Sequence, residues 1–398
     1  MRKLSLICII IVCLAGCSGA DKFEIKGADN AQRLDTYAGV AAYLQGQGLP
    51  GLKSAEVWKN GHGPGLKLTT AHYEIFTTLL EPFILRGISG FMESAYRAYN
   101  SQLPGPVSAV LRTPPEGVPA GRRPQADKRT YGGHRRKASC GLTVETKTKF
   151  TIYLFADRGQ WEDFTRSFAG EQAQMFYKIK AGAYYHNGAC VVYDIGRERT
   201  FSALGHEGWH QFNGRCFKFR LPSWLDEGVA MLFETHGSEE GLFYFEPAEN
   251  MYRLDGLKKT LTKNKMIPLE ELVTMNPGDV LATDRTEAVM AFYSQSYALV
   301  RFLQEAGYGR RLGVYRRLLA DGLRGDWALD EVNKTIAADR NIPKTVLWNR
   351  IVGRGLFEDY IGDDFDQIEK EYLAFCRQIV KTEDRGQKTE GTRLKTQD

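Results

Sequence analysis

Two histidines and a glutamate in the middle of the chain have the spacing of a metal site. The sequence HEGWH at 206–210 fits the pattern His-Glu-x-x-His. On a helix, His206 and His210 project from one face about a turn apart, so both imidazoles can reach one ion. Glu207 follows the first of these ligands and can lean toward the ion's open position. Apolar neighbours predict a helix that stops near Asn213-Gly214.

A further glutamate, Glu227, lies in a stretch that predicts a buried helix. The residues LPSWLDEGVAMLFETHG at 221–237 put apolar side chains on nearly every side of such a helix. Ser223 and Asp226 have the spacing of a capping box, so we expect a helix of about three turns from Ser223 to Gly237. A carboxylate buried at Glu227 needs a cation or a full set of hydrogen-bond donors.

A single Zn²⁺ ion could bind side chains from both predicted helices. Sixteen residues, 211–226, separate His210 from Glu227, enough for the chain to reverse and bring the second helix against the first. An ion bound by His206, His210 and Glu227 would partner the buried charges of this stretch, except Glu234. Three protein ligands leave a fourth position for water, which is typical of catalytic zinc sites. The alternative is a half-buried helix whose histidines bond to backbone carbonyls.

These residues resemble the gluzincin metallopeptidases, the thermolysin-like clan, which carry His-Glu-x-x-His on one helix and a glutamate ligand on the next. The chain is most similar to the peptidase-MA-like domains of secreted bacterial proteins. Those domains pair the motif with Pro-x-Trp-Leu-x-Glu-Gly-x-Ala, found here at 222–230. The resemblance extends over 66–305, although only the histidine and glutamate motifs are specific. It implies hydrolysis of a peptide or protein substrate, with Glu207 as general base.

The resemblance also implies further site residues. A tyrosine or histidine from a helical lobe usually stabilises the oxyanion; Tyr293 is the first candidate and Tyr297 the reserve, with a role in the core as the alternative for both. Met231 stands where thermolysin-like enzymes carry an aspartate that orients a histidine, and Glu234 is the candidate substitute. The aminopeptidase signature Gly-x-Met-Glu-Asn is absent from the sequence, so an endopeptidase is expected.

The first residues indicate export. Arg2 and Lys3 precede an apolar run too short for a permanent membrane span, and Leu-Ala-Gly-Cys follows at 14–17. This ending resembles the bacterial lipoprotein signal, which implies removal of 1–16 and a diacylated Cys17 as membrane anchor. Ser18 favours the periplasmic side of the outer membrane if the host has two membranes. An ordinary signal peptide that carries a cysteine is the alternative.

Positive charge is concentrated in one segment. Residues 112–137 hold eight Lys or Arg against two acidic residues, a net +6 beside the whole chain's +5. Proline and glycine interrupt this basic insertion, so we expect it to be exposed. Anionic lipid or an acidic envelope polymer are candidate partners, and a solvated loop is the alternative. Nucleic acid is not an expected partner of an exported protein.

The order of predicted elements favours an α+β fold, in which a small mixed or antiparallel sheet packs on the zinc-binding helices and a mostly helical C-terminal lobe follows. The expected domains are a tether with an N-terminal helix at 17–65, an α+β lobe at 66–240, a helical lobe at 241–381 and a polar tail at 382–398. The expected elements are a helix near 31–45, one or two strands in 66–79, a helix from Pro82, a strand at 149–157 and a hairpin at 182–194 that turns at Asn187-Gly188.

Two matters stay open at this point. Four cysteines remain after export and acylation, Cys140, Cys190, Cys216 and Cys376, and they allow three pairings. A non-catalytic lipoprotein that uses a peptidase-like fold for binding or assembly is the rival to an enzyme. Glu207 favours the enzyme, because a site that merely holds zinc needs no base there.

Overall fold

The computed structural model describes residues 36–104, 144, 146, 148–179, 182–239, 241–276, 278 and 286–394. The predicted signal peptide 1–16, Cys17 and the basic insertion 112–137 lie outside these residues. No helix in the described ranges combines the length and the apolar character needed to cross a membrane. Three of the cysteines, Cys190, Cys216 and Cys376, form no disulfide, and Cys140 lies outside the described part.

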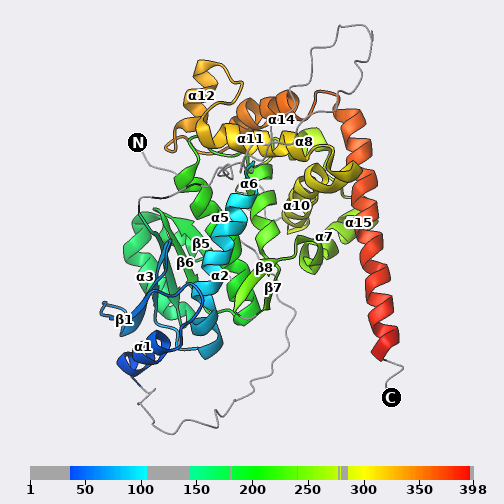
Figure 1. Cartoon of the computed structure of the whole chain (residues 1–398). Coiled ribbons are helices and arrows are strands. Elements are labelled where there is room, and N and C mark those ends of the chain that lie inside the picture. The colour runs from blue at the N-terminus through cyan, green and yellow to red at the C-terminus, as the bar shows by residue number, and fades with distance from the viewer. Residues whose placement is uncertain are drawn as a thin grey trace, which may run out of the picture.

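The strands and helices follow one another along the chain as shown in Figure 1. The strands are β1 (Ser54–Trp58), β2 (Gly65–Thr69), β3 (Tyr73–Thr77), β4 (Phe150–Phe155), β5 (Ala183–His186), β6 (Ala189–Tyr193), β7 (His236–Glu239) and β8 (Leu242–Phe245). The helices are α1 (Tyr37–Gly46), α2 (Pro82–Ser101), α3 (Arg158–Ala169), α4 (Ala173–Phe176), α5 (Arg197–Cys216), α6 (Ser223–Ala230), α7 (Met251–Thr262), α8 (Leu269–Leu272), α10 (Thr286–Gly309), α11 (Leu312–Arg324), α12 (Glu331–Ala338), α13 (Val346–Trp348), α14 (Gly355–Tyr360) and α15 (Phe365–Leu394).

Six strands form one mixed sheet in the order β1-β2-β3-β4-β6-β5, which confirms the predicted α+β class. Neighbours are antiparallel except for the parallel pairs β3–β4 and β4–β6. The hairpin β5–β6 turns at Asn187 and Gly188, whose φ values of 47° and 81° are those that a tight hairpin turn requires. Since β5 ends the order, one of its edges pairs with no described strand.

The two faces of the sheet carry different helices because side chains alternate along each strand. On β4, Phe150 points to the face covered by α2 and α5, where it contacts the rings of Tyr96 and Phe212. Tyr153 points to the opposite face and packs on Phe164 of α3. The helix with the His-Glu-x-x-His motif, α5, therefore lies directly on the sheet.

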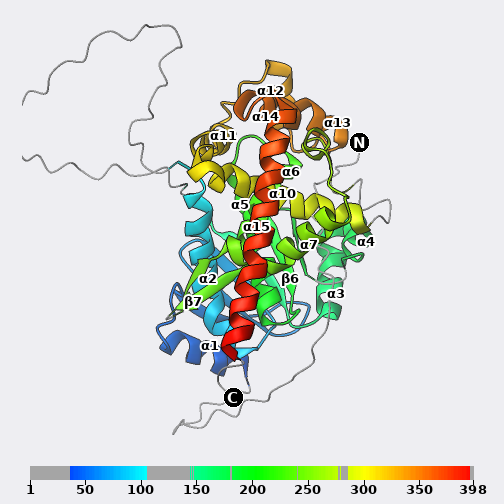
Figure 2. The same cartoon turned by 90° about the vertical axis from the view of Figure 1, so that its right-hand side faces the viewer.

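The helical region packs around α10, which contacts α6, α7, α11 and α15. Figure 2 shows α15 running along the length of the molecule beside α7 and α10. This helix continues to Leu394, into the range 382–398 that we assigned to a polar tail.

Several boundaries differ from the sequence predictions. Helix α6 ends at Ala230 and continues only as a 3-10 turn, Met231–Phe233, so the helix expected to reach Gly237 is shorter. The chain leaves the helix because the next residues pair in the β7–β8 hairpin. Strand β8 lies past residue 240, within the range that we assigned to the mostly helical lobe. Strand β1 lies in the range assigned to the tether and pairs with β2.

Gly208 allows a close contact between α5 and α2. A Cβ there would overlap the hydroxyl of Tyr99, which donates a hydrogen bond of 2.7 Å to the carbonyl of Gly205. At an exposed helical site, alanine would stabilise by about 1 kcal/mol relative to glycine. Here overpacking costs about 1–3 kcal/mol and the Tyr99 bond is disturbed.

We therefore expect Gly208→Ala to lower the free energy of unfolding by about 1–2 kcal/mol in urea titrations. Gly313→Ala is the matched control, because Gly313 is exposed on α11 and a Cβ there meets no atom within 4 Å. Equal stability of the Gly208 variant and the wild type would contradict the packing described for α2 and α5.

Candidate metal centre

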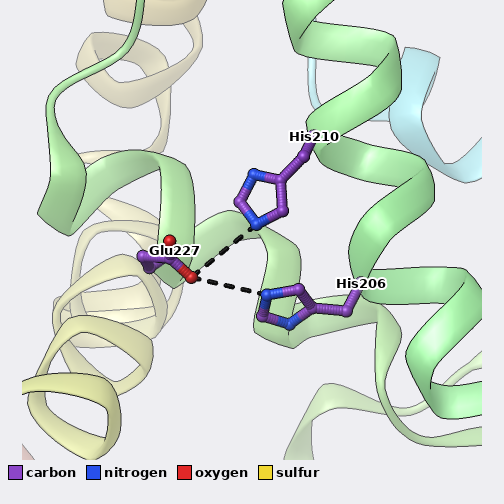
Figure 3. Close-up of side chains that lie close together, drawn as sticks. All are labelled: His206, His210 and Glu227. Atoms are coloured by element: carbon purple, nitrogen blue, oxygen red, sulfur yellow. Dashed lines mark ion pairs between the residues drawn. The ribbon is translucent and has the colours of Figure 1, made fainter. Parts of the chain in front are cut away.

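Three ligand atoms from two helices meet at one point (Figure 3). His206 Nε2 lies 3.4 Å and His210 Nε2 lies 3.7 Å from Glu227 Oε2. The histidines are one turn apart on α5, and Glu227 faces them from α6. All three side chains are buried. Neither His206 Nε2 nor Glu227 Oε2 makes a hydrogen bond with any described residue.

These separations fit an ion of the size of Zn²⁺. Ligand atoms at 2.0–2.1 Å from a tetrahedral zinc stand about 3.4 Å from one another. The two measured separations are 3.4 and 3.7 Å, and His206, His210 and Glu227 all have ligand atoms within 4.8 Å of one another. Two imidazoles and one carboxylate are also one of the donor sets found at catalytic zinc sites. The residues present therefore fit the metal that the sequence predicts.

Glu234 orients the first histidine. Its Oε1 atom lies 2.8 Å from His206 Nδ1. Arg253 of α7 holds the same carboxylate through Nε and one terminal nitrogen, at 2.8 and 2.6 Å, and Asn250 donates at 2.8 Å. Burial alone would raise the pKa of Glu234, but Arg253 outweighs it and lowers the pKa to about 2. An ionised Glu234 accepts from Nδ1–H, which leaves the lone pair of Nε2 facing Glu227.

Asp226 orients the second histidine, His210. Its Oδ1 atom lies 3.0 Å from His210 Nδ1 and accepts a hydrogen bond of 2.9 Å from Asn213. Lys344 Nζ donates to Oδ2 at 2.9 Å. Burial opposes ionisation of Asp226, yet Lys344 and His210 together hold its pKa well below the usual range. Each histidine thus has its own carboxylate, and each of those carboxylates has its own cation.

Two carboxylates are left without such a cation. Glu207 and Glu227 are buried, and no lysine or arginine of the described chain lies within ion-pair distance of either. Burial raises the pKa of Glu207 to about 7. Burial alone would lower the pKa of His206, but Glu227 and Glu234 raise it. The raised pKa values of Glu207 and His206 favour proton binding here in the protein without metal, and a divalent cation would supply positive charge in place of those protons.

Glu207 lies next to the three ligand residues without belonging to them. Both of its carboxylate oxygens are buried and make no hydrogen bond to a described residue. The backbone N–H of Tyr185, in edge strand β5, is close enough to influence its pKa. A buried acid with a raised pKa beside a metal site is the usual environment of a general base.

The two candidate tyrosines lie on α10, and both are buried. Tyr297 donates to the carbonyl of Pro247 and accepts from Arg301 at 3.0 Å, while burial raises its pKa to about 12. Its hydroxyl is therefore engaged in holding the helical region together. The ring of Tyr293 lies 5.4 Å from the guanidinium carbon of Arg253, the arginine that holds Glu234. Tyr293 is thus linked to His206 through two intermediate side chains.

A cavity of about 180 Å³ opens beside the second histidine. It lies between the β5–β6 turn, the C-terminal end of α5 and the segment that follows α12. His210 and Asp226 form part of its wall. This cavity gives the site a neighbouring space large enough for a small chemical group.

Asp226 has a different role from the one that its spacing predicts. We expected Ser223 and Asp226 to form a capping box, but α6 begins after Pro222 with no side-chain cap. The Ser223 backbone N–H donates instead to Asn349 Oδ1, at 3.0 Å, and Asp226 points to His210. The sequence carried one sign of this role. The helix around 226 and 227 was expected to be buried, and two adjacent acids on a buried helix point in different directions, so each needs its own partner.

Removing the charge of Asp226 should weaken metal binding. Outer carboxylates that orient a metal-binding histidine typically contribute about 10- to 100-fold to affinity, so we expect Asp226→Asn to raise the zinc Kd by that factor. Competition with a chromophoric chelator measures it. Asp330→Asn is the control, because Asp330 caps α12 far along the chain and asparagine caps equally well. An unchanged Kd in Asp226→Asn would remove this residue from the metal centre.

Comparison with known proteins adds no assignment, because no family model, curated protein or solved structure matches the chain.

Proposed function

We propose that the chain is a zinc-dependent peptidase, most simply an endopeptidase. The observation that carries this proposal is the convergence of His206, His210 and Glu227, buried together with the separations that a tetrahedral ion requires. When bound, Zn²⁺ lowers the pKa of its water and polarises a carbonyl group. The remaining steps fall to side chains of the protein.

Glu207 serves as the general base in this proposal. It takes the proton of the attacking water and delivers it to the leaving amine. Its carboxylate makes no hydrogen bond to a described residue, so it is available for this task. A cation bound beside it would favour the ionised form of Glu207, which is the form that accepts a proton. A protein that only stores or displays zinc has no need of a fourth buried acid, which is why we favour the enzyme over the non-catalytic lipoprotein.

Strand β5 aligns the substrate. One of its edges pairs with no described strand, and Tyr185 of this strand lies near Glu207. An extended peptide can add to such an edge through main-chain hydrogen bonds, as many peptide-binding proteins allow. Tyr293 remains our candidate for oxyanion stabilisation, and the engaged hydroxyl of Tyr297 makes it the weaker one.

We also propose that the protein acts at the cell envelope. Removal of 1–16 and acylation of Cys17 would anchor it to a membrane, on the periplasmic side of the outer membrane in a host with two membranes. The basic insertion 112–137 would then face anionic lipid or an acidic envelope polymer.

Digestion of a mixed peptide library by the purified full-length protein tests the activity. We expect cleavage at internal bonds, its loss after a zinc chelator and its return when zinc is added back. Cleavage that continues in excess chelator would contradict the zinc mechanism. A blank digest by the zinc-loaded protein would favour the binding protein instead.

A further inference from the structure

The side chains that line the cavity beside His210 carry more positive than negative charge. Its cationic lining residues are Arg220, Arg340 and Lys344, and the one carboxylate in its wall is Asp226. Asp226 already accepts from Lys344, from Asn213 and from His210. Neither arginine forms an ion pair with any carboxylate in the described part of the chain. The cavity therefore presents two guanidinium groups that make no ion pair with a described carboxylate, although Asp226 and Asp339 act on them from a greater distance.

Backbone carbonyls hold both arginines in place. Arg220 donates to the carbonyls of Asp339 and Ile342, and its guanidinium carbon lies 5.5 Å from the centre of the Trp348 ring. Arg340 donates to the carbonyl of Phe217 at 2.7 Å. A carbonyl positions a guanidinium without cancelling its charge. Arg220 is buried in the wall, whereas Arg340 is exposed and can contact a ligand directly.

This arrangement is costly to the protein on its own. Burial and the nearby charge of Arg340 together lower the pKa of Arg220 to about 10, although Asp226 and Asp339 oppose this shift. An anion bound between the two guanidinium groups would offset their repulsion, and a guanidinium pairs well with a carboxylate through two parallel hydrogen bonds.

The cavity is also contiguous with the proposed reaction site. His210 contributes to its wall from α5, and Tyr185 contributes from edge strand β5, where a peptide would lie. A peptide aligned along β5 would bring a side chain or its end to this cavity. The anions that an unmodified peptide carries are carboxylates.

We propose that this cavity binds a carboxylate of the peptide substrate, and that Arg340 is the side chain that contacts it. The carboxylate belongs either to an acidic side chain or to the free C-terminus. This inference rests on the proposed peptidase function and narrows its substrates to peptides with a carboxylate near the cleaved bond.

Calorimetry on the zinc-loaded full-length Glu207→Gln protein tests the inference without turnover. The probes are four versions of one alanine-based hexapeptide, with a central Glu or Gln and with a free or amidated C-terminus. We expect at least one carboxylate version to bind about 10- to 100-fold more tightly than the neutral version. Whichever carboxylate produces the preference identifies its source.

Variants of Arg340 assign that preference to the cavity. In the Glu207→Gln background, Arg340→Gln should abolish it, Arg340→Lys should keep part of it, and Arg377→Gln, on an exposed residue of α15, should leave it unchanged. Equal binding of all four peptides, no binding of any of them, or a preference that survives Arg340→Gln would overturn the inference. A charge preference in a wild type that cleaves nothing would support the cavity and reject the peptidase. A wild type that cleaves peptides but shows no charge preference would support the peptidase and reject the carboxylate-binding cavity.

Discussion

Glu207→Gln is expected to lower peptide cleavage by about 100- to 10,000-fold, the usual contribution of a general base, while zinc content stays at one ion per chain. Glutamine keeps the size of the side chain but cannot accept the proton of water. None of the three ligand atoms belongs to Glu207, so its loss should not release the metal. The measurement pairs initial rates on a cleaved peptide with elemental analysis of the same sample.

Glu198→Gln is the matched control for this variant, because Glu198 is on the same helix and its side chain is 79% exposed. It should retain both zinc and activity. Undiminished cleavage by Glu207→Gln would remove this residue from the mechanism. Loss of zinc from Glu207→Gln would instead mean that the carboxylate belongs to the metal centre.

Removing the proposed zinc is expected to destabilise the protein. Zinc at a thousand times its Kd stabilises the folded state by about 4 kcal/mol, if the unfolded chain binds none. Chelation should therefore lower the free energy of unfolding by about that amount, because Glu227 and Glu207 then remain buried without a metal cation. Urea titrations with and without chelator measure the difference. In Glu227→Gln, which lacks a ligand, the chelator should have almost no effect.

The effect of chelation should grow as pH rises. Glu207 has its pKa raised to about 7 in the folded protein without metal, so its proton stabilises that form fully below its unfolded pKa. This stabilisation is lost as pH rises through about 7, and the raised pKa of His206 adds a loss in the same direction. Zinc replaces these protons, so the loaded protein should not weaken in this range. Equal pH dependence of both forms would contradict the charge balance described for the site.

The parts of the site that could be predicted from the sequence are those determined by local spacing. His206 and His210 share a helix face because they are four residues apart, and Asn187-Gly188 forms the hairpin turn because both residues tolerate positive φ. The position of Glu227 opposite them followed from the apolar helix around it. In each of these three cases the prediction used only residues of a single helix or a single turn.

The outer parts could not be predicted because their partners are distant in the chain. Lys344 reaches Asp226 across 118 residues, and its sequence neighbourhood carries no sign of that contact. Asp226 was therefore interpreted as a helix cap, a local role that its spacing from Ser223 also fits. Glu234 was our candidate for orienting a histidine, and it lies beside His206. Its own partners, Arg253 and Asn250 of the next helical segment, were not predicted.

The metal centre itself is tested most directly by diffraction at the zinc absorption edge from crystals of the zinc-loaded protein. We predict one anomalous peak about 2.0–2.2 Å from His206 Nε2, His210 Nε2 and a carboxylate oxygen of Glu227. The absence of a peak between these three side chains, or a peak bound elsewhere in the chain with this position empty, would contradict it.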